Sequence, residues 1–502
     1  MTVPGAVGAR PWRRGRVAAL AIAVLAIPAA APASAGAAPH RPLQTAFTDA
    51  RVDPADANLV FSRMRAAGAT AVSMYVLWSD IAPPGSAKPA GFDPSNPADP
   101  QYSWTDLDAR VRAAVANGLS PILNVSRAPT WAEGGSAETQ FTEGAVRPNA
   151  QEFGAFMTAL ATRYSGHFGG LPRVRLWQAW VEPNLSFHLF PAYDTPYSQP
   201  VTASSHPVSP DLYAGLLTAF SAAVHRVHAD NVVIAGSLAP FGRYGPQDHG
   251  VPPLPFMRQL LCLTAGDRPL AGCSRRSQFD VWGQDPYTGG GPQHRASVPG
   301  NVSIGNLGEV RRTLAAAVRA GRVQSHGSPR FWVMEFGWNT RPPFAQGVPL
   351  ALHARWVSEA LYRMWLDGVS LVTWFQLRDD QSYVTGATFQ AGLYFHCARG
   401  PACDRPKPSL TAFRFPFVAF RNGARVLVWG RTPTSRPGRA RIEQRRGARW
   451  LALGTLGADR FGIFTAQLRA RGGGAVRAVF GGARSLAFSL TRPPDRVVNP
   501  PL

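Results

Sequence analysis

Two glutamates with similar surroundings are the strongest chemical signal in this sequence. Glu182 ends the apolar run 174–181 and is followed at once by Pro183, and Glu335 ends a second apolar run that starts at Phe331. Because proline has no N–H to continue a strand ladder, Pro183 predicts that the strand stops at the glutamate. A carboxylate at the lip of a buried strand costs free energy unless it is paired or used. Two carboxyl groups about 5 Å apart are what cleavage of a glycosidic bond with retention of configuration requires.

Each glutamate alone has an ordinary explanation, because a buried glutamate is as often tied to an arginine or lysine as it is used in chemistry. Two glutamates at matching ends of two apolar runs, about 150 residues apart, are less well explained in that way. The pair, more than either residue, predicts a catalytic site.

The elements that position this pair alternate from residue 36 to about residue 420, as short apolar runs and longer amphipathic segments. This alternation is typical of repeated strand–helix units and predicts an α/β fold, a (β/α)8 TIM barrel. The carboxyl ends of the strands of such a barrel open onto one face, so both glutamates are expected there. The expected strands are residues 42–47, 69–76, 120–125, 174–181, 231–237, 279–283, 331–335 and 369–376. The expected helices are residues 53–67, 104–117, 149–164, 211–227, 304–320 and 351–366.

From about residue 421 the pattern changes to short strands with glycine or proline between most of them. No helical pattern intervenes, which predicts a small all-β, sandwich-like module over residues 421–502. This module holds sixteen arginines and three acidic residues, a net charge of +13 out of +22 for the chain. The expected strands are residues 425–430, 439–444, 450–453, 462–468, 476–480 and 486–490.

The excess of arginine has two explanations. Lys88 and Lys407 are the only lysines, and this bias, with abundant alanine, glycine and proline, is typical of a GC-rich bacterial genome. The concentration of charge on one module favours instead an anionic partner, such as a cell-wall polymer, phospholipid head groups or an acidic polysaccharide. Nucleic acid is not among the expected partners.

Residues 1–35 have the pattern of an export signal. Four arginines lie between residues 10 and 16, the apolar stretch 17–27 follows, and Ala-Ser-Ala at 33–35 is a small-x-small cleavage site. The arginine pair at 13–14 also allows a twin-arginine signal. No later apolar run reaches the roughly 18 residues that a membrane-spanning helix needs. The sequence therefore predicts a secreted, extracellular protein without a transmembrane segment.

Four cysteines agree with an oxidising compartment. They fall as two close pairs, Cys262 with Cys273 and Cys397 with Cys403. Four cysteines allow three pairings, of which pairing between neighbours is the simplest. Two loop-closing disulfides are expected, each stabilising the fold by about 2–3 kcal/mol. No metal or cofactor is expected, because the histidines are scattered without ligand spacing, among them His167, His188, His249 and His294.

The segment Trp-Val-Glu-Pro-Asn at residues 180–184 resembles a known motif. It is similar to the acid/base motif on strand four of the large superfamily of (β/α)8 glycoside hydrolases that use two glutamates (clan GH-A). Residues 333–338, around Glu335, resemble the nucleophile motif on strand seven of that superfamily. The resemblance extends over residues 42–420 and is to secreted bacterial enzymes of the β-xylosidase and α-iduronidase branch, or of the cellulase-like branches.

The resemblance implies a role for each of these residues. Glu182 would be the general acid and base, and Glu335 would be the nucleophile. Asp285-Pro286-Tyr287 matches a strand-six site of the superfamily, in which Tyr287 would hold Glu335 in its ionised form. The burial that the neighbouring tryptophans suggest would keep Glu182 protonated by raising its pKa.

Four tryptophans are candidates for stacking on sugar faces, and each is equally consistent with a place in the core. Trp374 matches the strand-eight tryptophan that lies under the sugar in the superfamily, and Trp338 closely follows the second glutamate. The full set of candidates is Trp78, Trp131, Trp338 and Trp374.

Two positions depart from the pattern of the superfamily. Val181 stands where an asparagine usually binds the sugar 2-hydroxyl, and Asp285 stands where a histidine is usual. Three explanations follow: the substrate differs, Asn124 or Asn184 supplies the contact, or the barrel binds sugar without cleaving it. The sequence thus predicts an extracellular retaining glycoside hydrolase, with a catalytically weakened carbohydrate-binding or cell-wall-binding barrel as the alternative.

Overall fold

The computed structural model describes residues 41–49, 52–136, 142–196, 198–242, 250–381, 389–470 and 472–491. The predicted export signal, residues 1–35, lies outside these ranges. Within them, no helix combines the length and the apolar character needed to cross a membrane.

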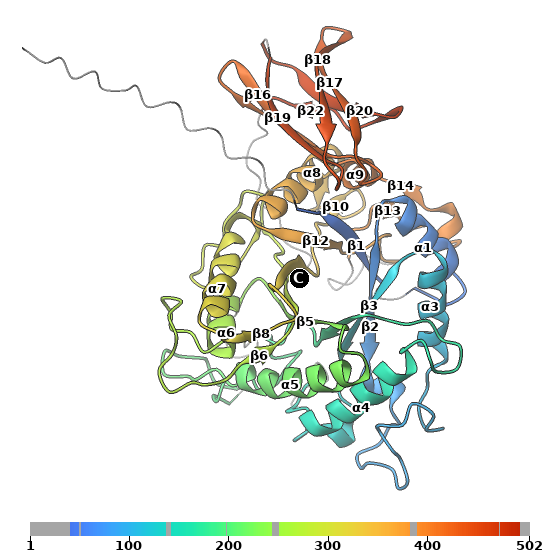
Figure 1. Cartoon of the computed structure of the whole chain (residues 1–502), viewed down its shortest axis with the longest axis vertical. Helices are drawn as coiled ribbons and strands as arrows, with labels where there is room; N and C mark the ends of the chain where they lie inside the picture. Colours follow the sequence, from blue (N-terminus) through green and yellow to red (C-terminus); the bar gives the residue numbers. More distant parts are fainter. Residues whose placement is uncertain are drawn as a thin grey trace, which may run out of the picture. The chain divides into compact units, whose positions relative to one another are not determined.

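The predicted barrel is confirmed: eight parallel strands close on themselves in the order β1-β12-β9-β7-β5-β4-β3-β2 (Figure 1). Every expected strand overlaps an observed one. The strands are β1 (Gln44–Asp49), β2 (Ala71–Leu77), β3 (Ser120–Ser126), β4 (Leu176–Ala179), β5 (Val232–Leu238), β7 (Val281–Gln284), β9 (Arg330–Val333) and β12 (Val369–Trp374).

Apolar side chains fill the barrel interior, and every strand or its end contributes to this core. Such a packed interior leaves no pore, so polar side chains can gather only where the strands end. The buried cluster consists of Ala46, Ala71, Ile122, Ile234, Val281, Trp332, Met334 and Leu371, with Leu176 and Val232 packed against it.

Helices surround the strands and follow one another round the barrel in chain order (Figure 1). All six expected helices are present. An additional helix, α6, was not expected because two of its first three residues are proline, which is tolerated only in a first turn. The long helices are α1 (Ala57–Ala66), α3 (Thr105–Ala116), α4 (Ala150–Arg163), α5 (Ser209–Val227), α6 (Pro253–Leu260), α7 (Gly308–Arg319) and α8 (Leu350–Leu366).

Short helices and two-residue strands lie in the connections between the barrel strands and helices. Helical turns are α2 (Trp78–Ile81), η1 (Thr130–Ala132), η2 (Ile304–Asn306), η3 (Pro401–Cys403) and α9 (Pro408–Arg414). Two-residue strands pair as β6 (Ser277–Gln278) with β8 (Val323–Gln324), β10 (Thr340–Arg341) with β11 (Val348–Pro349), and β13 (Tyr394–Phe395) with β14 (Arg405–Pro406).

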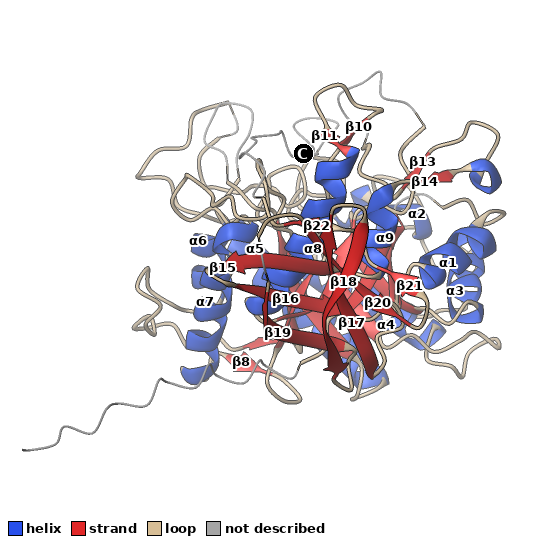
Figure 2. Cartoon of the chain, turned by 90° about the horizontal axis from the view of Figure 1, so that it is seen from above, coloured by secondary structure: helices blue, strands red, loops and turns tan. Residues whose placement is uncertain are grey.

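The C-terminal region forms two antiparallel sheets, as the sequence predicts (Figure 2). One sheet has the order β15-β16-β19, and the other β18-β17-β20-β21, with β22 pairing to β20. The fold is therefore an α/β TIM barrel followed by a β module. Its strands are β15 (Phe417–Asn422), β16 (Arg425–Arg431), β17 (Gly438–Arg446), β18 (Arg449–Ala458), β19 (Ile463–Arg469), β20 (Ala475–Phe480), β21 (Ala483–Arg484) and β22 (Phe488–Ser489).

A buried arginine joins the module to the barrel. Arg431, on β16, donates hydrogen bonds to the carbonyl oxygens of Leu43 and Phe413, and burial lowers its pKa to about 10. Next to it, the ring of Trp429 packs against the ring of Trp365 on α8 at 5.6 Å. One of the sixteen arginines of the module is therefore structural rather than a surface charge.

Both predicted disulfides are present. Cys262 pairs with Cys273 in the connection after α6, and Cys397 pairs with Cys403 before α9. Each bond closes a short surface loop and therefore restricts the unfolded chain locally.

Candidate active site

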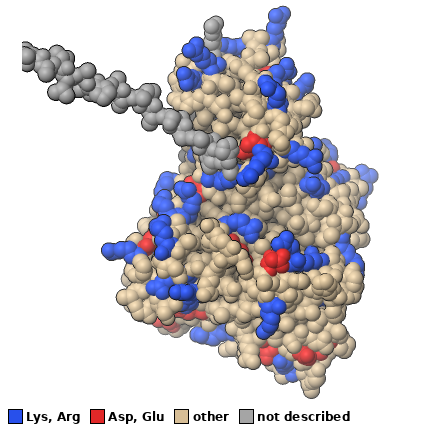
Figure 3. All heavy atoms as spheres, viewed as in Figure 1, with Lys and Arg blue, Asp and Glu red and all other residues tan. Residues whose placement is uncertain are grey.

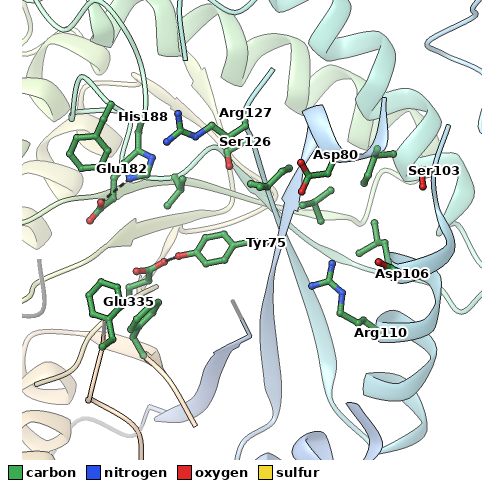
Figure 4. Close-up of a pocket in the computed structure, with 18 of the residues that line it drawn as sticks. Tyr75, Asp80, Ser103, Asp106, Arg110, Ser126, Arg127, Glu182, His188 and Glu335 are labelled. Atoms are coloured by element: carbon green, nitrogen blue, oxygen red, sulfur yellow. Dashed lines mark hydrogen bonds and ion pairs between the residues drawn. The ribbon is translucent and has the colours of Figure 1, made fainter. Parts of the chain in front are cut away.

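A cavity of about 570 Å³ opens at the carboxyl ends of the barrel strands (Figure 4). Most of its wall comes from the ends of β2, β3, β4, β7, β9 and β12 or from the residues that follow them, and helix α3 contributes another part. This is the face on which a TIM barrel builds its site. Three residues that the sequence singled out, Glu182, Glu335 and Tyr287, line this cavity together.

The backbone that carries Glu182 differs from the expectation. The strand β4 ends at Ala179, three residues before the glutamate, and both Trp180 (φ 67°) and Glu182 (φ 37°) lie in the left-handed region. The prediction that the strand runs to Glu182 is therefore wrong. The N–H of Glu182 donates instead to the carbonyl oxygen of Ser237 beyond the strand ladder, at 3.0 Å. Left-handed non-glycine residues are strained and cluster at functional sites.

The carboxyl group of Glu182 is buried and has one polar neighbour. Its side-chain oxygen Oε2 lies 3.4 Å from Nε2 of His188, and Oε1 has no hydrogen-bond partner among the described residues. Burial raises the pKa of Glu182. Trp177 and Trp180, which the sequence suggested as its apolar surroundings, are both fully buried.

The carboxyl group of Glu335 accepts hydrogen bonds from two phenol hydroxyls. Tyr287 donates to Oε2 at 3.2 Å, and Tyr75, on β2, donates a short hydrogen bond to Oε1 (Figure 4). Burial first, and then the charge of Glu182, raise the pKa of Glu335, while the two hydroxyls oppose this change. The hydroxyls stay protonated, because burial raises the pKa of both tyrosines.

A third carboxyl group lies behind the cavity wall. Asp285 accepts a hydrogen bond from Ser237 Oγ at 2.8 Å, and burial together with the charges of Glu335 and Glu182 raises its pKa. In the part of the chain that the structure describes, no arginine or lysine forms an ion pair with any of the three carboxyl groups. The ordinary explanation of a buried glutamate, a structural ion pair, therefore does not fit either glutamate.

Three of the four predicted tryptophans are packed away from the cavity. The indole N–H of Trp374 donates to the carbonyl oxygen of Ala391, and that of Trp338 donates to the carbonyl oxygens of Thr288 and Gly290. Trp78 is fully buried between the rings of residues on α4 and the ring of Trp131. None of these three lines the cavity, because their ring surfaces are used in the core.

The fourth tryptophan, Trp131, is partly exposed on η1. Its indole N–H donates to the carbonyl oxygen of Pro83 at 2.8 Å, and the ammonium of Lys88 lies 5.7 Å from its ring. Trp131 does not line the cavity either.

The two asparagines proposed to replace the missing contact have different surroundings. Asn184 is fully used: its amide donates to the carbonyl oxygens of Ala239 and Val251, and its Oδ1 accepts from the N–H of Ala239. Asn124, on β3, pairs in register with Tyr75 on β2. The Oδ1 atom of Asn124 has no hydrogen-bond partner among the described residues, so Asn124 is the one that retains hydrogen-bonding capacity.

Sequence reasoning missed eight polar residues of the cavity wall, of which three lie near the two glutamates: Tyr75, Arg127 and His188. The other five are Asp80, Ser103, Asp106, Arg110 and Ser126. Tyr75 had a weak signal, a phenol side chain near the end of a mostly apolar strand. Arg127 follows β3 directly, and its guanidinium donates to the carbonyl oxygen of Glu143 at 2.7 Å. His188 lies in irregular backbone, where no periodicity reports the direction of a side chain.

One group of described residues has donor atoms close enough to share a metal ion, His225, Asp280 and His326, with all ligand atoms within 4.8 Å. This group lies at the amino ends of the strands, since Asp280 precedes β7, and it does not line the cavity. Asp280 already accepts hydrogen bonds from the backbone N–H groups of Val233 and His326. These contacts tie β5 to β7 and explain the cluster without an ion.

Comparison with known proteins supports the fold. The sequence matches no protein family and no curated protein. Among solved structures, a family 39 glycoside hydrolase from the gut symbiont Bacteroides cellulosilyticus WH2 is similar, with a TM-score of 0.52 and 16% identity over 86% of this chain and 79% of that chain. A family 39 enzyme from Xanthomonas axonopodis pv. citri has a TM-score of 0.45 and 15% identity over 87% and 96% of the two chains. The likeness to the Bacteroides enzyme shows that this chain shares the fold of that protein.

Proposed function

We propose that this protein is a glycoside hydrolase that cleaves an O-glycosidic bond by double displacement, with retention of configuration. The observation that carries the proposal is that Glu182 and Glu335 line one cavity at the carboxyl face of the barrel, with both oxygens of Glu335 held by tyrosine hydroxyls. Two carboxyl groups flanking the scissile bond are the machinery of this reaction.

The donors around each carboxyl group suggest which glutamate loses its proton first. Hydrogen bonds to the charged form of an acid lower its pKa, and Glu335 accepts two O–H groups whereas Glu182 has one nitrogen neighbour. Buried carboxyl groups that share a site do not both ionise readily. The active form therefore has Glu335 ionised and Glu182 protonated, in agreement with the roles that the sequence resemblance implies.

In the first step a carboxylate oxygen of Glu335 attacks the anomeric carbon and forms an ester bond, while the glycosidic bond breaks. The leaving oxygen takes the proton of Glu182. The ester has removed the negative charge of Glu335, so Glu182 now ionises at lower cost. In the second step Glu182 takes a proton from water, the oxygen of that water attacks the anomeric carbon, and the ester breaks to regenerate Glu335.

One residue of the cavity favours the alternative function. Val181 lines the wall next to Glu182 and has no group to bind a sugar hydroxyl. A site without a hydrogen bond to this hydroxyl stabilises the transition state less. A barrel that binds carbohydrate without cleaving it is expected to have such a site.

Trapping the covalent intermediate separates the two functions. The protein would be incubated with activated 2-deoxy-2-fluoro glycosides of several sugars and examined by intact mass spectrometry. An adduct on a peptide that contains Glu335, absent from Glu335→Gln, is expected. Because these reagents lack the 2-hydroxyl, hydrolysis of the matching 2-hydroxy aryl glycosides would be measured in parallel. No adduct and no hydrolysis with any sugar would overturn the proposal in favour of the binding protein.

We also propose that the protein acts outside the cell, because of its two disulfides and the export-signal pattern of residues 1–35. N-terminal sequencing of the protein recovered from culture medium should find a chain that begins just after residue 35. A chain retained inside the cell with its first residues intact would contradict the proposal.

The basic module is proposed to bind an anionic polymer of the cell wall. Arginine side chains are spread over its visible face and over that of the barrel (Figure 3), so composition bias remains the competing explanation. Deleting the module would remove Arg431 and expose the barrel surface that it contacts, so surface substitutions in the full chain are the better test. The test variant replaces three exposed arginines of the module by serine, Arg439, Arg445 and Arg449.

A matched control replaces three exposed arginines of the barrel by serine, Arg276, Arg312 and Arg319. Both variants lose the same charge. If the module binds the polymer, its variant should adhere to purified cell walls more weakly, and with a weaker dependence on salt, than the control. Equal adhesion of the two variants would leave composition bias as the explanation.

A further inference from the structure

His188 is held over Glu182 by the course of the backbone between them. The carbonyl oxygen of Glu182 accepts from the N–H of Leu185, and that of Leu185 accepts from the N–H of His188, each at 3.0 Å. The carbonyl oxygen of His188 also accepts from the indole N–H of Trp180 at 2.7 Å. Two consecutive turns and this indole contact bring the imidazole back to the carboxyl group, where Nε2 lies 3.4 Å from Oε2 (Figure 4).

The imidazole is neutral at physiological pH. Burial first, and then the positive charge of Arg127, lower the pKa of His188 to about 3. A neutral imidazole has one N–H donor and one nitrogen that accepts. An ionised carboxylate can only accept a hydrogen bond, so towards it the nitrogen next to Oε2 acts as the donor. The other ring nitrogen, Nδ1, is buried and has no partner among the described residues.

The two oxygens of Glu182 are therefore different. Oε2 faces His188, whereas Oε1 has no hydrogen-bond partner among the described residues. An acid that protonates a leaving group needs its proton on an oxygen that is free to reach the substrate, and it must keep that proton near neutral pH. A cation at the same distance as His188 would lower the pKa of the acid by about 1–3 units, whereas a neutral N–H orients the group at a smaller cost.

We propose that His188 is a positioning residue for Glu182: its neutral N–H holds Oε2, so that Oε1 carries the proton given to the leaving oxygen. This inference rests on the proposed function. In the second step of the reaction the same N–H stabilises the carboxylate that receives a proton from water. Arg127 contributes indirectly, because its charge adds to the effect of burial in lowering the pKa of the imidazole.

Other titratable groups also act on Glu182, and they stay constant when only His188 is changed. They come from β2 (Tyr75), from the residue after β3 (Arg127) and from the segments after β7 and β9 (Asp285, Tyr287 and Glu335). A change in the pH profile of a His188 variant therefore reports the contact with His188 itself.

Three substitutions of His188 change the group beside Oε2 of Glu182 in different ways. His188→Gln keeps a neutral N–H donor, His188→Phe removes it, and His188→Lys places a cation beside the acid. The measurement is kcat/KM against pH, whose alkaline limb reports loss of the acid proton in the free enzyme. His206→Gln is the matched control, since His206 is exposed in the same connection and does not line the cavity.

The expected shifts have opposite signs. His188→Lys should move the alkaline limb to lower pH by about 1–3 units, because the cation favours the ionised acid. His188→Phe should move it to higher pH and reduce kcat/KM by about tenfold or more, because the carboxylate loses its donor. His188→Gln should keep the limb within a few tenths of a unit of the wild type. The loss in His188→Phe should be larger for an aryl glycoside with a poor leaving group than for a dinitrophenyl glycoside, which needs little acid assistance.

An unchanged alkaline limb in His188→Lys or His188→Phe, or a loss that does not depend on the leaving group, would overturn the inference and leave His188 a packing residue. Thermal unfolding would show which variants fold, and any two of the three that fold decide the sign of the shift. Failure of the proposed function would look different: Glu182→Gln would then keep the leaving-group dependence of the wild type.

Discussion

The two glutamates of the cavity are held in different ways. Glu335 follows a regular strand, β9, and accepts hydrogen bonds at both oxygens from Tyr75 and Tyr287. Glu182 lies three residues beyond β4 in left-handed backbone, and one of its oxygens has no partner among the described residues. Glu335, which accepts more hydrogen bonds, is suited to bear a negative charge. Glu182, which has an oxygen without a partner, is suited to carry the proton that is transferred.

Removing the carboxylate of Glu335 should have the largest effect on activity. Glu335→Gln keeps the shape of the side chain and takes away the nucleophile, so no ester can form. Loss of a nucleophile that acts with its partners as a unit lowers kcat by at least about 10⁴-fold. The measurement is steady-state hydrolysis of an aryl glycoside, and a loss of less than tenfold would show that Glu335 does not attack the sugar.

Removing the proton donor should have a smaller effect that depends on the substrate. Glu182→Gln should reduce kcat/KM by about 10²–10⁴-fold for a poor leaving group, the range of general acid catalysis. The reduction should be much smaller for a dinitrophenyl leaving group. In Glu182→Ala, which leaves a space, added azide should restore turnover by attacking the ester and forming a glycosyl azide, since the small anion fits where the carboxylate was. An equal reduction for both leaving groups would contradict the role of acid.

Removing one donor from Glu335 should have a moderate effect with a defined sign. In Tyr75→Phe the carboxylate loses a hydrogen bond, so the pKa of Glu335 rises and more of the protein carries a protonated nucleophile at neutral pH. The acid limb of kcat/KM should move to higher pH, with about a tenfold loss near neutrality. Tyr102→Phe is a suitable control, because that hydroxyl donates to the carbonyl oxygen of Pro94 and does not line the cavity. An acid limb that stays in place would show that Tyr75 does not stabilise the anion.

The smallest expected effect is on stability. Burial raises the pKa of both glutamates above the value of an unfolded chain, so the folded state binds more protons. The stability that these protons contribute is fully present below about pH 4.3, the ordinary glutamate pKa, and is lost as pH rises through the raised values. Thermal unfolding of Glu335→Gln should therefore show a weaker decline with rising pH than the wild type, with a gain of a few °C at the alkaline end. A decline equal to that of the wild type would contradict the raised pKa of Glu335.

Local sequence patterns determined the framework of this protein. The apolar runs predicted all eight barrel strands, and the change of pattern near residue 421 predicted the β module, because both signals depend on neighbouring residues. The spacing of Cys262, Cys273, Cys397 and Cys403 predicted both disulfides. Glu182 and Glu335 were located for the same reason, since each ends an apolar run on an element whose carboxyl end opens onto the same face.

The tertiary structure alone decided the surroundings of the two glutamates. Tyr75 reaches Glu335 across 260 residues of sequence because closing the barrel leaves only β1 and β12 between β2 and β9. His188 reaches Glu182 through irregular turns that carry no periodicity. Trp374 and Trp338, which were candidates for stacking on a sugar, lie in the core, where each indole N–H donates to a backbone carbonyl. Direction and burial of a side chain depend on packing between distant segments, and no local pattern specifies that packing.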